Sequence, residues 1–419
     1  MATIGWIYFS KNDRDRIGSV LDQLRPEGTI DELGMGTIRD ALSNQMFPGI
    51  STIQTRAKYF FIIPYLLHDY QNDKQLQKKY KDPAKYLERR EYEIMWDLGD
   101  YYRALSSDTD TRESYGVIGI TKIRREKDFI VRRPSAIYWN GLYTYQFINT
   151  QGLATDSFLR QVTNPSLESL LSNVKRGDDT FGDDLDVEHE NLFRLKVTPN
   201  LNWKEGLTLD LDQKEAEFFQ DRIISIAKHK LIAELLQNEA LWAIAIVSDN
   251  FMDFAKTALY TDSLSLPDSL RAMLVLAHDF SMLMYGAHLA YNCQLQHKLN
   301  NDCFDVEFQE WTEQIGELML DYDHFNPQFL FSYATTTRSN TAQFVQDWWQ
   351  QTQLGFPDHQ KRDALIEQQE ARVKGAKARL RWNKLDLVKE KKWQGLKFFE
   401  YRFSQARTIV KDIKIGLNQ

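Results

Sequence analysis

Carboxylates near one lysine are the part of this sequence with the clearest spacing for hydrolytic chemistry. Asp212-Gln213-Lys214 has the D-x-K order of a nuclease strand, and Asp186 and Glu188 lie upstream in an acidic stretch. Two carboxylates that held Mg²⁺, with a lysine beside them, would activate water against a phosphodiester. Asp212 followed by Glu215 is also a capping box, which opens a helix. The pattern favours the helix start and leaves a cryptic metal-dependent nuclease as an alternative.

Histidines and cysteines do not have the spacing of a metal site. His278, His288 and His297 fall on one expected helix but are ten and nine residues apart, whereas two histidines that share a metal on a helix need a spacing of three or four. Cys293 and Cys303 form no CxxC pair, and the P-loop, nucleophile-elbow and HExxH motifs are absent from the sequence. We therefore expect no catalytic residues, no metal and no cofactor.

Cations grouped with polar or aromatic side chains are the stronger functional candidates, because Lys and Arg neutralise nucleic-acid phosphates. One group lies at the start of an expected helix, a second flanks an expected hairpin, and a third lies in an expected long helix over 358–389. The alternative is a solvated polar face or, at the C-terminus, a basic helix docked on an acidic surface. We predict twelve nucleic-acid-binding residues: Thr52, Gln54, Arg56, Lys58, Arg124, Arg125, Arg132, Arg133, Lys377, Arg379, Arg381 and Lys384.

The charge of the chain is unevenly distributed. Its formal net charge is −7, yet residues 361–419 carry 16 Lys and Arg against 7 Asp and Glu, and the rest of the chain carries 36 against 52. A basic end on an acidic body is typical of proteins that contact nucleic acid, and also of chains whose two parts dock on each other. Both interpretations stay open at this level.

Hydrophobic periodicity predicts the elements that must position these residues. With 419 residues, two or three packed units are expected. A short helix over 37–46, the turn Phe47-Pro48-Gly49 and a second helix from Ser51 or Thr52 match a helix-turn-helix, and helices around a basic hairpin near 118–131 match a winged helix. We predict a mainly α, multi-domain fold with helix-turn-helix or winged-helix-like N-terminal units and a few short strands. The predicted segments are 1–70, 71–175, 176–357 and 358–419.

Nothing in the sequence predicts a membrane or secreted protein. The first residues lack the basic stretch and apolar run of a secretory signal, and the longest apolar runs, 60–67 and 240–247, are too short to cross a bilayer. Two cysteines without motif spacing fit a reducing compartment. We expect a cytoplasmic protein with no membrane contact.

Several stretches of the sequence together form a family pattern. They are Gly5-Trp6-Ile7-Tyr8-Phe9-Ser10, Asp13-Arg14, Asp31-Glu32-Leu33-Gly34-Met35-Gly36, Ile38-Arg39-Asp40, Phe47-Pro48-Gly49-Ile50-Ser51-Thr52-Ile53-Gln54-Thr55-Arg56-Ala57, Arg133-Pro134-Ser135-Ala136-Ile137-Tyr138-Trp139-Asn140-Gly141-Leu142 and Tyr401-Arg402-Phe403. These stretches resemble a bacterial family of uncharacterised proteins, known as a domain of unknown function, over nearly the whole chain. The resemblance implies a protein often encoded near phage-defence genes, together with helicases and phospholipase-D-like nucleases.

Together, these observations predict an accessory DNA-binding component of an antiphage defence system. It would neutralise phosphates with its basic helices, while a helicase or nuclease partner performed the hydrolysis. One alternative is a protein-interaction scaffold whose basic end binds an acidic surface. The other is the cryptic nuclease built on Asp186, Glu188, Asp212 and Lys214.

Overall fold

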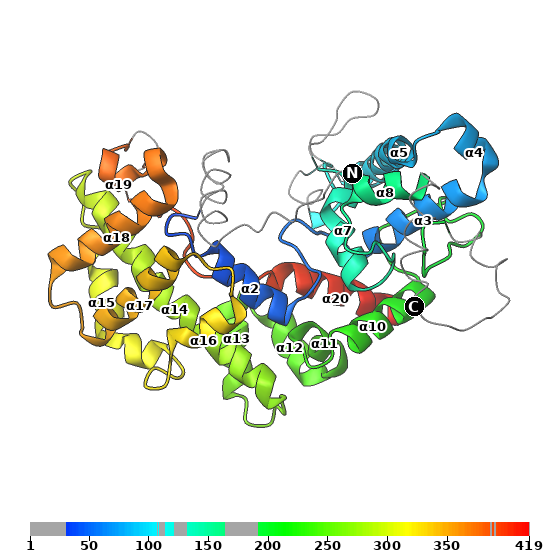
Figure 1. Ribbon diagram of the computed structural model, residues 1–419. Coiled ribbons are helices and arrows are strands. Elements are labelled where there is room, and N and C mark those ends of the chain that lie inside the picture. Colours follow the sequence, from blue (N-terminus) through cyan, green and yellow to red (C-terminus); the bar gives the residue numbers. More distant parts are fainter. Residues whose placement is uncertain are drawn as a thin grey trace, which may run out of the picture. The chain divides into compact units, whose positions relative to one another are not determined.

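The computed structural model is mainly helical (Figure 1), which confirms the mainly α part of the predicted fold. It describes residues 31–106, 108, 114–120, 132–163, 192–385, 388 and 391–418. In these ranges, β structure is limited to one antiparallel bridge between Ile148 and Leu195. The elements are α2 (Gly36–Met46), α3 (Tyr59–Asn72), α4 (Lys74–Lys79), α5 (Pro83–Leu105), α7 (Pro134–Thr144), α8 (Thr155–Thr163), α10 (Gln213–Ile226), α11 (Leu231–Gln237), α12 (Glu239–Val247), α13 (Phe251–Tyr260), α14 (Asp268–His297), α15 (Asp305–Leu318), α16 (Pro327–Tyr333), α17 (Ser339–Gln353), α18 (His359–Lys374), the 3-10 helix η1 (Gly375–Lys377), α19 (Arg379–Trp382) and α20 (Phe403–Leu417).

The described residues form two compact units. Unit 1 combines residues 31–46 with 247–401, and unit 2 combines residues 47–246 with 402–418. Each unit joins stretches that are distant in the sequence. Among the described helices, none has the length and apolar character needed to span a membrane.

Unit 1 is built around the long helix α14. Every residue of α14 from Ala277 to Gln296 is buried, as expected for a helix surrounded by others, and α2, α13, α15 and α18 all pack against it. Gly286 lets an indole approach the helix closely, because a Cβ at this position would lie 2.1 Å from the Trp311 ring. The Trp311 side chain then donates to the carbonyl of Met282 at 3.2 Å.

Unit 2 surrounds an aromatic core formed by α3, α7 and α10. Phe60 of α3 has its ring centroid 5.0 Å from Tyr138 of α7 and 4.6 Å from Phe219 of α10. Gly141 of α7 allows this approach, because a Cβ there would lie 2.6 Å from Phe60. The C-terminal helix α20 packs against α10 and α11 in the same unit (Figure 1).

Helix α3 does not begin where the sequence predicts. We expected a helix from Ser51 or Thr52, but α3 begins at Tyr59. The amides before it are bound by distant side chains: the N–H groups of Thr55 and Arg56 both donate to the Tyr138 hydroxyl, and that of Ala57 donates to Asp412. These long-range bonds hold the segment outside a helix.

Candidate nucleic-acid interface

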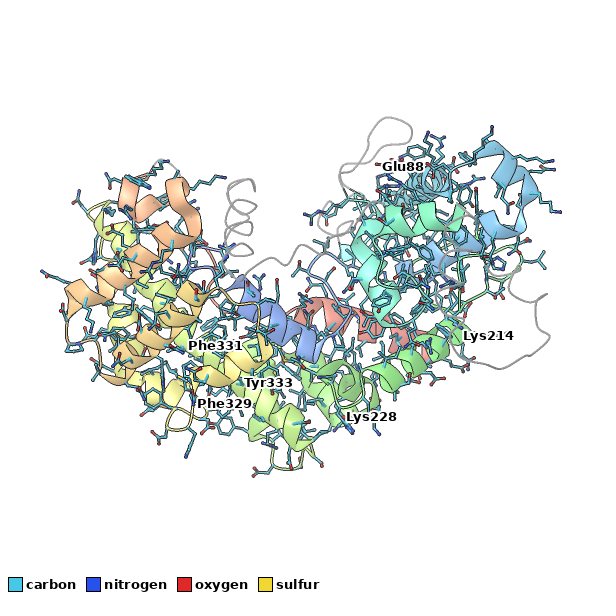
Figure 2. All side chains as sticks on the ribbon, in the orientation of Figure 1. Glu88, Lys214, Lys228, Phe329, Phe331 and Tyr333 are labelled. Atoms are coloured by element: carbon cyan, nitrogen blue, oxygen red, sulfur yellow. The ribbon has the colours of Figure 1, made fainter. Side chains whose placement is uncertain are left out.

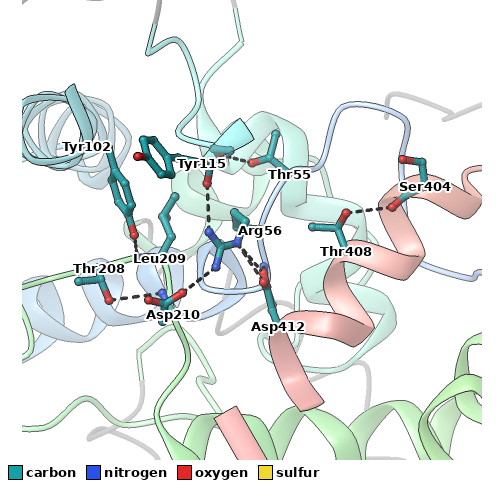
Figure 3. A network of polar contacts seen from close by, with 12 residues as sticks. Thr55, Arg56, Tyr102, Tyr115, Thr208, Leu209, Asp210, Ser404, Thr408 and Asp412 are labelled. Atoms are coloured by element: carbon teal, nitrogen blue, oxygen red, sulfur yellow. Dashed lines mark hydrogen bonds and ion pairs between the residues drawn. The ribbon is translucent and has the colours of Figure 1, made fainter. Parts of the chain in front are cut away.

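Arg56, a predicted DNA contact, lies in a network of internal bonds in unit 2 (Figure 3). Its Nε donates to both Asp412 carboxylate oxygens at 3.0 and 2.9 Å, its Nη2 to Asp210 at 2.8 Å and its Nη1 to the Tyr115 carbonyl at 3.0 Å. The Arg56 side chain is 15% exposed and that of Asp412 is 5% exposed. Because carboxylates of unit 2 neutralise its charge, Arg56 is poorly suited to bind a phosphate. We call these four residues the Arg56 cluster.

Most of the other predicted residues in this group also bond to groups within unit 2. Lys58 donates to both oxygens of buried Glu215, at 2.8 and 2.6 Å. Gln54 is buried, and its Nε2 donates to the Gly49 carbonyl at 3.1 Å. Thr52 is exposed. In this group, therefore, only Thr52 presents its side chain freely to solvent.

The second predicted group is only partly described. Arg124 and Arg125 lie outside the described residues, and Arg132 is exposed. Arg133 lies 3.5 Å from buried Glu91 of α5 in an ion pair. Glu91 also accepts bonds from the backbone N–H and the hydroxyl of Ser135, in the first turn of α7. A carboxylate at a helix N-terminus satisfies free N–H groups and the helix dipole, so Arg133 and Glu91 together stabilise the start of α7.

Glu91 makes the stability of unit 2 dependent on pH. Burial raises the pKa of Glu91 to about 7, against the opposing effect of Ser135 and Arg133. Because the folded state binds the proton of the Glu91 carboxyl more tightly than the unfolded state does, protonation of Glu91 stabilises the fold. This stabilisation is complete below the ordinary carboxyl pKa and is lost as pH rises through about 7. We expect Glu91 to lower the free energy of unfolding by roughly 3 kcal/mol across that window. In chemical denaturation, the free energy of unfolding of Glu91→Gln should fall less steeply with rising pH than that of the wild type. Equal slopes for the two proteins would contradict this assignment.

The D-x-K segment is a helix start. The Asp212 carboxylate accepts from the Glu215 N–H at 2.9 Å, and the Glu215 carboxylate accepts from the Asp212 N–H at 3.0 Å, which confirms the capping box. Lys214 lies exposed in the first turn of α10 (Figure 2). Asp186 and Glu188 lie outside the described residues. Across the part of the chain that the structure does describe, no three His, Cys, Asp or Glu side chains are grouped to hold a metal ion.

The three histidines of α14 have separate surroundings. His278 contacts Asp279, whose buried carboxylate accepts from the N–H groups of Leu320 and Asp321 at 2.7 and 2.9 Å. His288 is buried beside the Phe399 ring, and burial lowers its pKa. His297 lies at the exposed end of the helix. Asp279 therefore holds the loop after α15 in place.

The third predicted group lies on unit 1, where a buried carboxylate positions it. Glu370 of α18 is fully buried and accepts from the Tyr291 hydroxyl at 3.0 Å and from the N–H groups of Arg379 and Leu380, each at 2.9 Å. These two N–H groups lie in the first turn of α19, where the helix itself provides no acceptor for them. Leu380 is buried on the inner side of α19. The bond to Glu370 thus fixes the short helix that carries the cations.

A second basic segment lies beside α19. Asn292 of α14 donates to the Gln394 carbonyl at 3.1 Å and accepts from its N–H at 2.7 Å. One turn later on α14, Gln296 accepts from the Lys391 N–H at 3.0 Å. Arg379 Nη1 then reaches the Gln394 side chain at 3.5 Å and joins the two segments. We call the resulting patch the α19 surface, which consists of Arg379, Arg381, Trp382, Lys384, Lys391 and Lys392.

Three cations of the α19 surface, Arg379, Arg381 and Lys384, contact uncharged groups. Lys384 Nζ donates to the Ala376 carbonyl at 2.6 Å, and the Arg381 guanidinium carbon lies 5.4 Å from the Trp382 ring centroid. Within the described ranges, no carboxylate forms an ion pair with Arg379, Arg381 or Lys384. The sequence from 372 to 397 holds ten Lys and Arg against two acidic residues. This patch can therefore neutralise a polyanion, in contrast to the Arg56 cluster.

Comparison with known proteins adds a family but no activity. A family model described as a family of unknown function, DUF6361, matches residues 1–403. The chain belongs to this family. The match confirms the resemblance seen in the sequence and includes the whole α19 surface of this DUF6361 protein. No curated protein and no solved structure matches the chain.

Proposed function

We propose that this protein is an accessory DNA-binding subunit that holds the phosphate backbone with the α19 surface. The observation that supports this is the contrast between two kinds of cation. Arg56, Lys58 and Arg133 are paired with carboxylates of unit 2, whereas cations of the α19 surface contact neutral groups on an anchored turn. An unpaired surface cation can release counterions from DNA at little cost in internal bonds.

The proposal includes the setting that the family resemblance implies. The protein would act in the bacterial cytoplasm beside phage-defence enzymes, and a helicase or nuclease partner would perform the hydrolysis. The helix-turn-helix and winged-helix units expected from the sequence stay predictions, to which Thr52 and Arg132 could contribute as exposed side chains. Binding through the α19 surface does not depend on them.

A scaffold function has one observation in its favour. Helix α16 of unit 1 exposes two aromatic side chains, because Phe329 is 60% exposed and Tyr333 is 41% exposed (Figure 2). Exposed aromatic residues are enriched where proteins contact partners. In this second candidate function, α16 would bind another protein and the α19 surface would meet an acidic partner.

A salt titration tests the DNA-binding proposal. We expect the logarithm of the affinity for duplex DNA to fall linearly with the logarithm of salt concentration, because each neutralised phosphate releases counterions. Replacing Arg379, Arg381 and Lys384 together with alanine should weaken binding at least ~10-fold near 0.1 M salt and reduce the slope by about 2–3. The measurement is fluorescence anisotropy of a labelled duplex.

The control removes the same number of charges elsewhere. Lys214, Lys228 and Lys256 are exposed and lie away from the α19 surface in the sequence, so their triple alanine variant should bind nearly as tightly as the wild type. Equal losses in both variants would mean that net charge, and not the α19 surface, determines binding. Absence of binding at low salt, to duplex and single-stranded DNA alike, would refute DNA binding altogether.

A further inference from the structure

Trp382 is the exposed tryptophan of the α19 surface. Its side chain is 55% exposed, while every other tryptophan in the described ranges is buried or half-buried. An indole is the largest apolar side chain, so leaving it in water forgoes a favourable burial. Its neighbour Leu380, two residues earlier, is buried in unit 1, so the helix had an inner face available and Trp382 lies on the outer one.

The indole is held in a defined position. Its Nε1 donates to the Gly375 carbonyl at 3.2 Å. Gly375 ends α18 with a φ of +56°, a conformation that L side chains rarely adopt. Asn383 follows Trp382 in the left-handed region and ends α19. The ring is therefore fixed before any ligand arrives, which lowers the ordering cost of stacking on it.

Cations lie next to this ring. The Arg381 guanidinium is 5.4 Å from its centroid, and Lys384 is bound to Ala376 in the turn between α18 and α19. A fixed aromatic platform among cations matches the chemistry of one nucleotide, with the phosphate on the cation and the base on the ring. In a duplex, neighbouring base pairs already cover the base faces, so only an unpaired base can stack on the indole.

We infer that the α19 surface binds single-stranded nucleic acid in preference to duplex, with an unpaired base stacked on Trp382. This inference rests on the proposed function, because it requires that the surface bind nucleic acid at all. Stacking of one base on an aromatic side chain corresponds to roughly a 5- to 100-fold gain in affinity. Trp382 should supply this gain for single strands, while the cations supply the part common to all forms.

The test compares three ligands of equal length, namely a single strand of thymidines, the same backbone with abasic sites, and a duplex. Anisotropy titrations use the full chain and the variants Trp382→Ala and Trp382→Phe, both of which lose the bond to Gly375. We expect Trp382→Ala to weaken binding of the thymidine strand at least ~5-fold more than it weakens binding of the duplex and abasic ligands. Trp382→Phe should retain most of the thymidine affinity, because phenylalanine keeps an aromatic face.

The outcomes separate the two proposals. Equal loss on all three ligands, or no loss on any, would overturn the stacking inference while DNA binding itself stood. Competition by polyglutamate as effectively as by thymidine strands, with no effect of Trp382→Ala, would overturn it in favour of an acidic protein partner. If no ligand binds at low salt, the proposed function fails and the inference fails with it.

Discussion

Replacing Arg56 with methionine should lower the free energy of unfolding of unit 2 by about 3–5 kcal/mol. The loss follows from what the substitution leaves behind. Asp412 is 5% exposed and would keep its charge without its guanidinium partner, and the Tyr115 carbonyl would lose a donor. A buried ion whose partner is removed costs more than the intact pair contributed. The measurement is urea denaturation followed by circular dichroism.

The pH dependence of this variant distinguishes electrostatics from lost packing. Burial raises the pKa of Asp412, and the charge of Arg56 and the Ala57 N–H partly offset this rise. Without Arg56 the folded-state pKa would rise further. A carboxyl with a raised folded-state pKa stabilises the fold at low pH and loses that contribution as pH rises through the pKa. Arg56→Met should therefore recover stability as the solution is acidified, whereas a packing defect would not respond.

Two controls accompany the Arg56 variant. Arg89→Met removes an exposed arginine from an ion pair with Glu93, and exposed pairs of this kind contribute less than about 1 kcal/mol. Combining Arg56→Met with Asp412→Leu removes both charges and should restore much of the lost stability. If Arg56→Met costs no more than Arg89→Met, the Arg56 cluster does not stabilise unit 2.

Replacing Glu370 with alanine should destabilise unit 1 and weaken DNA binding at the same time. The substitution leaves the Tyr291 hydroxyl and two N–H groups of α19 without an acceptor, and each unsatisfied buried group costs about 1–3 kcal/mol. We expect a loss of at least about 3 kcal/mol in the free energy of unfolding, measured by urea denaturation. With its first turn released, α19 should no longer hold Arg379 and Arg381 in place.

The sign of the binding change identifies Glu370 as a positioning residue. Removing a carboxylate makes the protein more positive, which by itself should strengthen binding to a polyanion. A decrease in affinity, measured where circular dichroism shows the variant to be folded, therefore indicates displaced cations. Glu367→Ala, on the same helix at a half-buried position, makes the same charge change and should bind DNA as tightly as the wild type or slightly tighter. A Glu370→Ala variant with unchanged affinity would show that the turn holds without the carboxylate.

Local features of the fold could be predicted from the sequence. The helix at 36–46, the long helix over 268–297 and the capping box of Asp212 and Glu215 all agree with the prediction. Each depends on residues within a few turns of one another, through periodicity, capping and propensity. The long helix expected over 358–389 is instead α18 followed by η1 and α19, because Gly375 and the bonds to Glu370 turn the chain.

The partners of the predicted site residues could not be found in the same way. No spacing rule connects Gln394 with Asn292, 102 residues earlier, or indicates that Glu370 caps α19. The basic composition near the C-terminus was visible, but not which of its cations face solvent. Trp382 and Lys391 belong to the α19 surface only because α14 and α18 hold their segments together.

The amino-acid sequence alone determined a mainly helical chain, its family and the excess of cations after residue 360, since these depend on composition and short-range pattern. Tertiary structure alone decided which cations remain available. Arg56 meets Asp412 across 356 residues and Lys58 meets Glu215 across 157, and such meetings depend on how the helices pack. Whether a cation is available to bind a ligand depends on whether folding places a carboxylate beside it. No local sequence pattern encodes the distance between the two groups.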